Sequence, residues 1–271
     1  MTYKLFWGEL HTHSNCSVDC RQGADPETLI HYARRFLDFF ALADHNQCPD
    51  APSYLASHLG TSETSGKIAA MVRNGIEGRL LKDTWGRTQR LIAENNEPGR
   101  FVTFLGYEWS SFKYGDHNIY YLNDYEPCIP AKTPRELYNN LKGKPAIIIP
   151  HHPAYPLRSR GIDWQYVKEE FAPVVEIFSM HGSSENDTGP YPMLRNPMGP
   201  RVTEGTIFEM LKRGLKLGFI ASSDSHGIAA PYGRGYTGIF AKELSREALW
   251  KGLINKKTIA VTGDRIEISL R

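Results

Sequence analysis

Imidazole and carboxylate side chains recur in this chain beside short apolar segments. His11 and His13 directly follow the apolar run 4–10, and Asp224 and His226 follow a second run near the C-terminus. Side chains two residues apart in extended backbone point the same way, so each pair can bind one cation. Imidazole nitrogen and carboxylate oxygen are ligands of zinc, manganese and iron. The two pairs therefore predict a metal site, and their repetition predicts more than one ion.

The same residue types occur at further positions along the chain. These are Asp44-His45, Glu108, Asp116-His117 and His151-His152, and Asp19 adds a carboxylate six residues after His13. The strand expected at 146–149 favours His151 as a ligand, which leaves His152 as a support or a substrate contact. Asp44 is expected to orient an imidazole, as acidic neighbours of metal ligands commonly do. The chain thus offers ligands for two or three divalent ions, either zinc, manganese or iron.

A centre of this kind favours hydrolysis. Bridged cations lower the pKa of a shared water, so that hydroxide is available as the nucleophile at neutral pH. The sequence has no Gly-x-Ser-x-Gly segment, no phosphate-binding lysine loop and no Gly-x-Gly-x-x-Gly after a strand. We therefore expect a metal-dependent hydrolase that uses a metal-bridging hydroxide and needs no serine or cysteine nucleophile.

Predicted strands and helices alternate along the chain. Strands are expected at 4–10, 39–43, 101–107, 118–122, 146–149, 174–179, 219–222, 236–241 and 259–262, and helices at 27–38, 134–142, 204–213 and 246–254. This alternation is typical of a parallel sheet or barrel in an α/β domain. A barrel places its functional residues at the carboxyl ends of its strands. We expect one domain, 1–271, with a helical insertion at about 60–98 and a long loop at about 182–201.

The combined motifs resemble the PHP (polymerase and histidinol phosphatase) superfamily. The resemblance rests on His11-x-His13-Ser14-x-x-Ser17-x-Asp19, Ala43-Asp44-His45, Glu108, His117, Pro150-His151 and Ser223-Asp224-x-His226, in that order. It implies a distorted (β/α)7 barrel with its metal site at the carboxyl ends of the strands. It also implies three ligand sets: His11, His13, Glu108 and Asp224; Glu108 as a bridge with His117 and His151; and Asp19, His45 and His226.

Three further segments resemble one branch of that superfamily, which includes hydrolases of aryl carbamates. They are Glu176–Ser184, Ala221–His226 and Ala260–Ile266. Within them, Glu176 could support a metal ligand or could simply be a carboxylate at the end of a strand; the sequence leaves both possibilities open. His181 begins the long loop and is expected to contact substrate, so that Glu108, Asp224 and His181 form the candidate catalytic set.

Two substrate classes suit such a centre. A phosphoester fits electrostatically, because cations and arginines can bind a dianion. Arg158, Arg160, Arg234 and His152 are the candidate substrate-binding residues. The alternative is a carbamate, amide or ester, for which Tyr155, Tyr191, Tyr232 and Tyr236 could line an apolar pocket. We favour a phosphoesterase acting on a small phosphorylated substrate.

Composition and charge argue against membrane and nucleic-acid functions. The chain has 271 residues, is 41% hydrophobic and 23% charged, and has a net charge of +2, as expected for a globular enzyme. No apolar segment approaches the roughly 20 residues that cross a bilayer. We expect a cytoplasmic protein with a small-molecule substrate, no membrane association and no nucleic-acid partner; oligomeric state stays open. A non-catalytic metal-binding module, such as those that accompany bacterial DNA polymerases, is the alternative from a different class.

Overall fold

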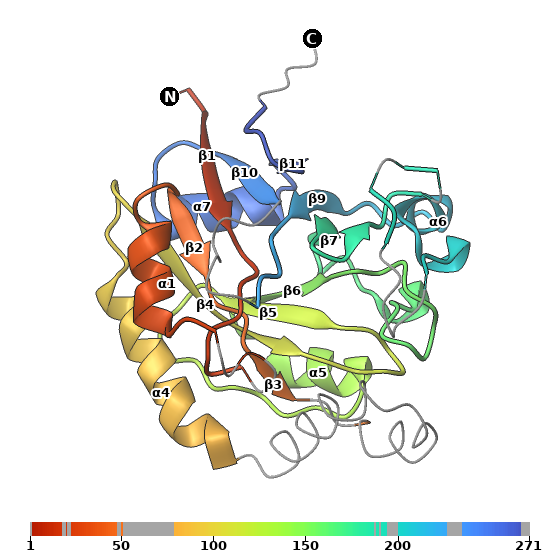
Figure 1. Ribbon diagram of the computed structural model, residues 1–271, viewed down its shortest axis with the longest axis horizontal. Helices are drawn as coiled ribbons and strands as arrows, with labels where there is room; N and C mark the ends of the chain where they lie inside the picture. Colours follow the sequence, from red (N-terminus) through yellow and green to blue (C-terminus); the bar gives the residue numbers. More distant parts are fainter. Residues whose placement is uncertain are drawn as a thin grey trace.

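The chain forms a mixed α/β fold, in which the predicted alternation of strands and helices is found. The structure is a computed structural model and describes residues 2–17, 20, 23–47, 50, 79–186, 188–189, 191–193, 200–226 and 235–266. Asp19, Arg234 and Tyr232, together with much of the expected insertion and loop, lie outside these ranges. Figure 1 shows the strands crossing the centre of the molecule, with helices on their outer faces.

The larger sheet has eight strands in the order β11-β10-β1-β2-β4-β5-β6, with β3 paired to β4. Their bounds are β1 Lys4–Glu9, β2 Phe39–Ala41, β3 His45–Gln47, β4 Val102–Trp109, β5 His117–Tyr121, β6 Ala146–Pro150, β10 Tyr236–Ala241 and β11 Thr258–Val261. Strands β1, β2 and β4 are parallel, and β5 runs antiparallel to both β4 and β6. The carboxyl ends of β1, β2, β4 and β6 therefore share one edge with the amino end of β5.

A second sheet has three strands in the order β8-β7-β9, with bounds β7 Val174–Ser179, β8 Gly182–Ser183 and β9 Gly218–Ala221. Strands β7 and β9 are parallel, and β7 contacts β6 while β9 contacts β10 and β11. The small sheet thus lies between the two ends of the larger, curled sheet. The described strands include antiparallel pairs and form two sheets, so the expected (β/α)7 barrel is not confirmed.

Helices begin where the sequence provides a side-chain cap. The helices are α1 Pro26–Ala33, α4 Arg79–Glu94, α5 Pro134–Leu141, α6 Ile207–Lys212 and α7 Arg246–Ile254, with short 3-10 helices η1 at Trp164–Tyr166 and η2 at Thr203–Gly205. Asp25, Thr133, Thr206 and Ser245 each accept a hydrogen bond from the backbone N–H three residues later. Helix α1 ends at Ala33, before the predicted residue 38, and Asp38 lies beyond it, where it accepts a hydrogen bond from Trp7 N.

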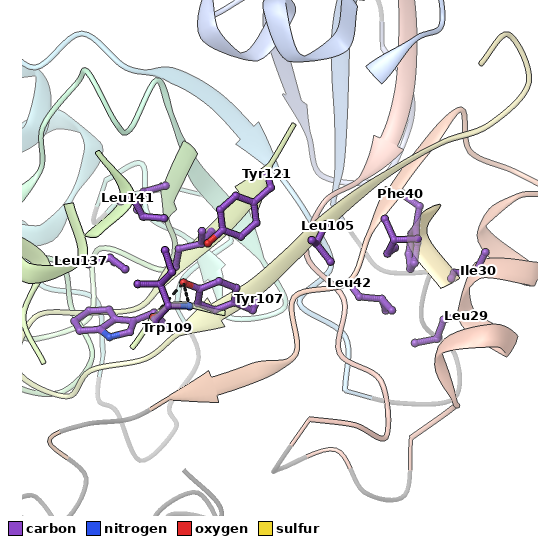
Figure 2. Packing of buried hydrophobic residues seen from close by; sticks show 14 of the residues in the cluster. Leu29, Ile30, Phe40, Leu42, Leu105, Tyr107, Trp109, Tyr121, Leu137 and Leu141 are labelled. Carbon is purple, nitrogen blue, oxygen red and sulfur yellow. Dashed lines mark hydrogen bonds between the residues drawn. The ribbon is translucent and has the colours of Figure 1, made fainter. Parts of the chain in front are cut away.

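The main hydrophobic core joins α1 to α5 across the larger sheet. Leu29 and Ile30 of α1 are buried at one end of this cluster, and Leu137 and Leu141 of α5 at the other. Figure 2 shows the residues of β4, including Leu105, in the space between them. Each Å² of apolar surface buried in this core contributes about 25 cal/mol to stability. This packing holds the strand ends in place.

The expected insertion contains helix α4, which lies beside α1 on the outside of the molecule (Figure 1). Trp85 of α4 donates a hydrogen bond to Glu126 O and packs edge-on against Tyr107. This helix thus belongs to the same packed core as the sheet. Among the described residues, no helix is both long and apolar enough to span a membrane.

Candidate metal centre

The segments after β1 and β9 pair with each other beyond the ends of their strands. Asp224 N donates to His11 O at 2.9 Å, and His13 N donates to Ser225 O at 3.0 Å. This parallel pairing brings the His-x-His and Asp-x-His segments side by side, although more than 200 positions separate His11 from Asp224 in the sequence. Asp224 has a φ of +53°, a left-handed conformation that Asp tolerates better than most residues.

His11, His13 and Asp224, which we call the β1/β9 group, direct three ligand atoms toward one point. The Nε2 atoms of His11 and His13 are 3.1 Å apart, and Asp224 Oδ1 lies 3.3 Å and 3.0 Å from them. All three residues are buried. Two imidazole nitrogens and a carboxylate oxygen at these separations can coordinate a single divalent cation.

Glu108, at the end of β4, connects the two sides of the centre. Its Oε2 atom lies 3.5 Å from His11, 3.4 Å from His13 and 3.2 Å from His45, while its Oε1 atom lies 3.0 Å from His151 Nε2. Glu108 is fully buried, yet Oε2 has no hydrogen-bonding partner among the described residues. Such an atom is costly to bury unless a cation or a donor satisfies it.

A second set of three imidazoles adjoins the first group. His13, His45 and His226 have ligand atoms within 4.8 Å of one another. The rings of His13 and His226 stack with centroids 4.0 Å apart, and those of His13 and His45 with centroids 4.7 Å apart. The structure thus brings together two of the three residues predicted for one ion, while Asp19 lies outside the described residues.

The residues around β5 and β6 form another candidate group. Asp116, His151 and His152, the β5/β6 group, are buried and have ligand atoms within 4.8 Å of one another. His151 Nε2 lies 3.9 Å and His152 Nε2 lies 3.3 Å from Asp116 Oδ2. Both histidines face this group because His152 has a φ of +31°, which turns the backbone after His151. The expected choice between the two histidines is therefore not exclusive.

His117 was predicted as a ligand together with Glu108 and His151, and the structure does not bring these three together. The register of β4 and β5 pairs Glu108 with Asn118 and Trp109 with His117. Paired residues share a face, so His117 emerges on the face opposite to Glu108. Its ring packs edge-on against Trp109, and Nδ1 donates to Gly115 O at 3.1 Å. Asp116, the preceding residue, lies on the inner face instead.

Hydrogen bonds on the far side of the rings fix which nitrogen is free. His11 Nδ1 lies 3.0 Å from Glu176 Oε2, and His226 Nδ1 donates to Asp224 O. His45 Nδ1 donates to Ser110 Oγ at 2.8 Å, since that hydroxyl donates in turn to Glu108. A histidine that donates from Nδ1 presents the Nε2 lone pair, as metal-binding histidines do. The residues present therefore fit a divalent metal centre.

Two buried carboxylates support the ligands without belonging to the predicted sets. Glu176 Oε2 lies 3.0 Å from His11 Nδ1, a position that suits a supporting role, and its ligand atom also lies within 4.8 Å of those of His11 and His151. Glu9 accepts hydrogen bonds from His11 N and Ser223 N, both at 2.8 Å. Glu9 was not predicted as a site residue, although it is the lone carboxylate inside the apolar run 4–10. Asp44 accepts from Ser14 N and Ser14 Oγ and so shapes the turn after the His-x-His segment.

Burial and charge shift the pKa values of these groups in different directions. Burial lowers the pKa of His13 to about 3 and raises that of Glu9 to about 8. Burial alone would raise the pKa of Glu108, but its electrostatic interactions with His45 and His151 and its hydrogen bonds with His11 and His151 outweigh burial and hold that pKa well below its usual range. Glu108 is therefore an ionised ligand at neutral pH.

His181 lies at the rim of the centre. Its Nε2 lies 2.9 Å from Asp224 Oδ2, and its Nδ1 is hydrogen-bonded to the Tyr155 hydroxyl, also at 2.9 Å. The His181 side chain is 16% exposed, against 2% for Asp224, so it can touch a molecule in solution. Tyr155 lies behind it and is fully buried.

The other predicted substrate-binding residues are spread more widely. Arg160 contacts Asp116 and lies 3.5 Å from Glu108 Oε1, whereas Arg158 is exposed. The three described tyrosines lie apart: Tyr155 contacts His181, Tyr191 packs against Phe178, and Tyr236 packs against the main core. Arg234 and Tyr232 lie outside the described residues.

Part of the chain is similar to a family without an assigned function. Residues 32–121 match the family described as "Protein of unknown function (DUF3604)". An uncharacterized protein from Chlamydia pneumoniae is 27% identical over 98% of this chain and 40% of its own length. One from Chlamydia muridarum is 28% identical over 72% of this chain and 34% of its own length. The chain thus spans less than half the length of these relatives.

Three solved structures share the fold. A two-domain protein from Bacteroides vulgatus, containing a predicted PHP-like metal-dependent phosphoesterase, has a TM-score of 0.55 at 16% identity, over 96% of this chain and 66% of its own. Endonuclease Q, in complex with a DNA duplex that carries an abasic lesion, has a TM-score of 0.52 at 11% identity, over 92% and 56%. PsfC from Pseudomonas syringae has a TM-score of 0.50 at 15% identity, over 96% and 92%. At these identities the likeness establishes a shared fold.

Proposed function

We propose that this protein is a metal-dependent hydrolase of the PHP type that cleaves a phosphoester in a small substrate. One observation carries the proposal: His11, His13, Asp224 and Glu108 direct nitrogen and oxygen atoms toward one buried point, at separations of 3.0 to 3.5 Å. When bound there, divalent cations supply hydroxide at neutral pH and polarise the bond under attack. Zinc, manganese and iron all suit this mixture of ligands.

The chain's own residues have separate parts in this proposal. Glu108 and Asp224 hold the cations, and the histidines of the β1/β9 group and of the set with His45 complete their ligands. His181 is the catalytic candidate that contacts substrate, because its side chain is partly exposed at the rim and its Nε2 lies 2.9 Å from Asp224 Oδ2. Tyr155 fixes its ring by the hydrogen bond to Nδ1.

Charge favours a phosphoester over an acyl substrate. The guanidinium of Arg160, 13% exposed and 3.5 Å from Glu108, places a fixed positive charge beside the centre. A phosphoryl dianion gains from such a charge, whereas a neutral carbamate or ester gains little. The alternative of a carbamate, amide or ester hydrolase would need an apolar pocket, which the described tyrosines do not assemble.

The decisive experiment combines elemental analysis of the purified protein with three substrate classes. The substrates are p-nitrophenyl phosphate, a naphthyl carbamate ester, and a DNA duplex with an abasic site, the last because Endonuclease Q binds such DNA. Asp224→Asn removes a ligand charge, and Asp264→Asn makes the same change at an exposed position as the control.

We expect at least one metal per chain and turnover of the phosphate monoester, both lost in Asp224→Asn and retained in Asp264→Asn. Turnover of the carbamate alone would transfer the assignment to the acyl hydrolases. Cleavage of the abasic duplex alone would overturn the expected absence of a nucleic-acid partner. Full metal occupancy without turnover of any substrate would support a non-catalytic module.

A further inference from the structure

Arg160 occupies an unusual position among the ligand-type residues. Its Nε donates to Asp116 Oδ2 at 2.5 Å, a second nitrogen of the same guanidinium also contacts Asp116 Oδ2, and that nitrogen lies 3.5 Å from Glu108 Oε1. The guanidinium therefore lies between the two carboxylates that a cation in the β5/β6 group would use.

The β5/β6 group has the chemistry to bind a cation of its own. Asp116, His151 and His152 are buried, and their ligand atoms lie within 4.8 Å of one another, as do those of the β1/β9 group. Nitrogen and oxygen donors in this number suit the same divalent metals. A cation here would share Asp116 and Glu108 with Arg160, and like charges in a buried site repel strongly.

The backbone around Arg160 is built to deliver this side chain. Arg158 and Arg160 have φ values of +67° and +71°, a conformation that L residues rarely adopt. Arg160 N donates a hydrogen bond to Phe112 O at 3.0 Å, which holds the backbone of Arg160 in this conformation. A Cβ on Gly161 would lie 1.8 Å from Tyr155 O, so only glycine permits the loop to pack there. Unfavourable backbone of this kind persists where it has a function.

We propose that the Arg160 guanidinium takes the place of a metal ion in the β5/β6 group. The proposal rests on the metal-dependent function above and deepens it, because it reduces the expected two or three ions to two. One would bind in the β1/β9 group and the other among His13, His45 and His226. Arginine stays protonated at any physiological pH, so this positive charge cannot dissociate as a metal can. The centre would then combine exchangeable cations on one side with a permanent guanidinium on the other.

The test counts metal ions. Wild-type protein and the variants Arg160→Ala, Arg160→Gln and Asp116→Asn are stripped with a chelator, reloaded with Mn²⁺, desalted and analysed for manganese per chain. Arg158→Ala is the matched control, since it lies in the same loop with the same backbone conformation but is exposed. Electron paramagnetic resonance reports whether any added ion couples magnetically to its neighbour, and circular dichroism checks folding.

We expect Arg160→Ala and Arg160→Gln to bind one more manganese ion than wild type, with a new exchange-coupled signal. Arg158→Ala should match wild type, and so should Asp116→Asn, because Asp116 holds arginine rather than metal. Equal counts of one or more in wild type and in folded Arg160 variants would refute the proposal, as would loss of an ion in Asp116→Asn. Less than one ion per chain in wild type would instead refute the metal centre itself.

Discussion

The β1/β9 group and the β5/β6 group contain the same residue types, at the same depth, but differ in what surrounds their carboxylates. Asp224 in the first lies 3.0 to 3.3 Å from imidazole nitrogens. Asp116 in the second lies against a guanidinium as well. A carboxylate that faces only imidazoles can bind an external cation, whereas the charge of one already paired with arginine is balanced. Ligand-type residues therefore predict a metal only when their counter-charges are also known.

Glu108 links the two groups, so its substitution should have the largest effect. Glu108→Gln keeps the shape of the side chain but removes the charge that faces His45, His151 and Arg160. We expect kcat/KM for p-nitrophenyl phosphate to fall by about 1,000-fold, which corresponds to about 4 kcal/mol of transition-state stabilisation. Steady-state kinetics and metal analysis measure the change.

Glu170→Gln, the same change at an exposed position, should leave activity intact. Full activity in Glu108→Gln would mean that the carboxylate does not connect the two groups.

The two groups also differ in how far the sequence could predict them. His11 and His13 follow from strand geometry alone, because residues two apart share a side. The second group depends on the register that pairs Glu108 with Asn118, which places Asp116 rather than His117 on the inner face. It depends as well on the positive φ of His152. Register and local backbone geometry come from tertiary packing, and no spacing rule predicts them.

The fold, too, has local features that the sequence predicts and non-local features that it does not. The strands and capped helices agree with their periodicity and cap residues to within a few positions, since those signals are local. The sheet order is not local: β5 runs antiparallel between β4 and β6, which a barrel of uniform β/α units does not allow. The short strand β3 was missed because His45–Gln47 has no apolar pattern. Its pairing with β4 places His45 beside Glu108.

A substitution of Glu176 tests a residue that contacts His11 of the β1/β9 group on the side of the ring away from Nε2. Glu176→Gln removes the charge that lies 3.0 Å from His11 Nδ1 but leaves an oxygen that can accept the same hydrogen bond. We expect the dissociation constant for Mn²⁺ to rise by about 10- to 100-fold, with the number of bound ions unchanged. Competition with a fluorescent chelator measures the affinity. Loss of a whole ion would show that Glu176 is itself a ligand.

Glu9 supports both ligand segments of the β1/β9 group, and its ionisation couples them to pH. Burial raises its pKa from the ordinary 4.5 to about 8 in the folded protein. The stabilisation from protonated Glu9 is therefore fully present below about pH 4.5 and is lost as pH rises through about 8. Between these values it should weaken by about 1.4 kcal/mol per pH unit.

Urea unfolding of chelator-treated protein between pH 5 and 8 measures this slope. Glu9→Gln cannot ionise, so the difference in slope between it and wild type isolates the contribution of Glu9. Parallel stability curves for the two proteins would show that Glu9 is already ionised across this range.

His117 gives the smallest expected effect and separates the β5/β6 group from the ligand set that the PHP resemblance implies. His117→Phe retains the ring that packs against Trp109. It loses the hydrogen bond to Gly115 O, but it also removes Nε2, a buried nitrogen that has no hydrogen-bonding partner in the described part of the chain. The substitution leaves Gly115 O without its donor but also ends the cost of burying the unpaired Nε2, and these two effects of similar size oppose each other, so we expect stability to change by less than about 1 kcal/mol. Metal content should match wild type if, as proposed, the Arg160 guanidinium between Glu108 and Asp116 takes the place of a metal ion. Loss of one ion in folded His117→Phe would show that His117 is a metal ligand. It would also contradict the proposal that the Arg160 guanidinium takes the place of a metal ion.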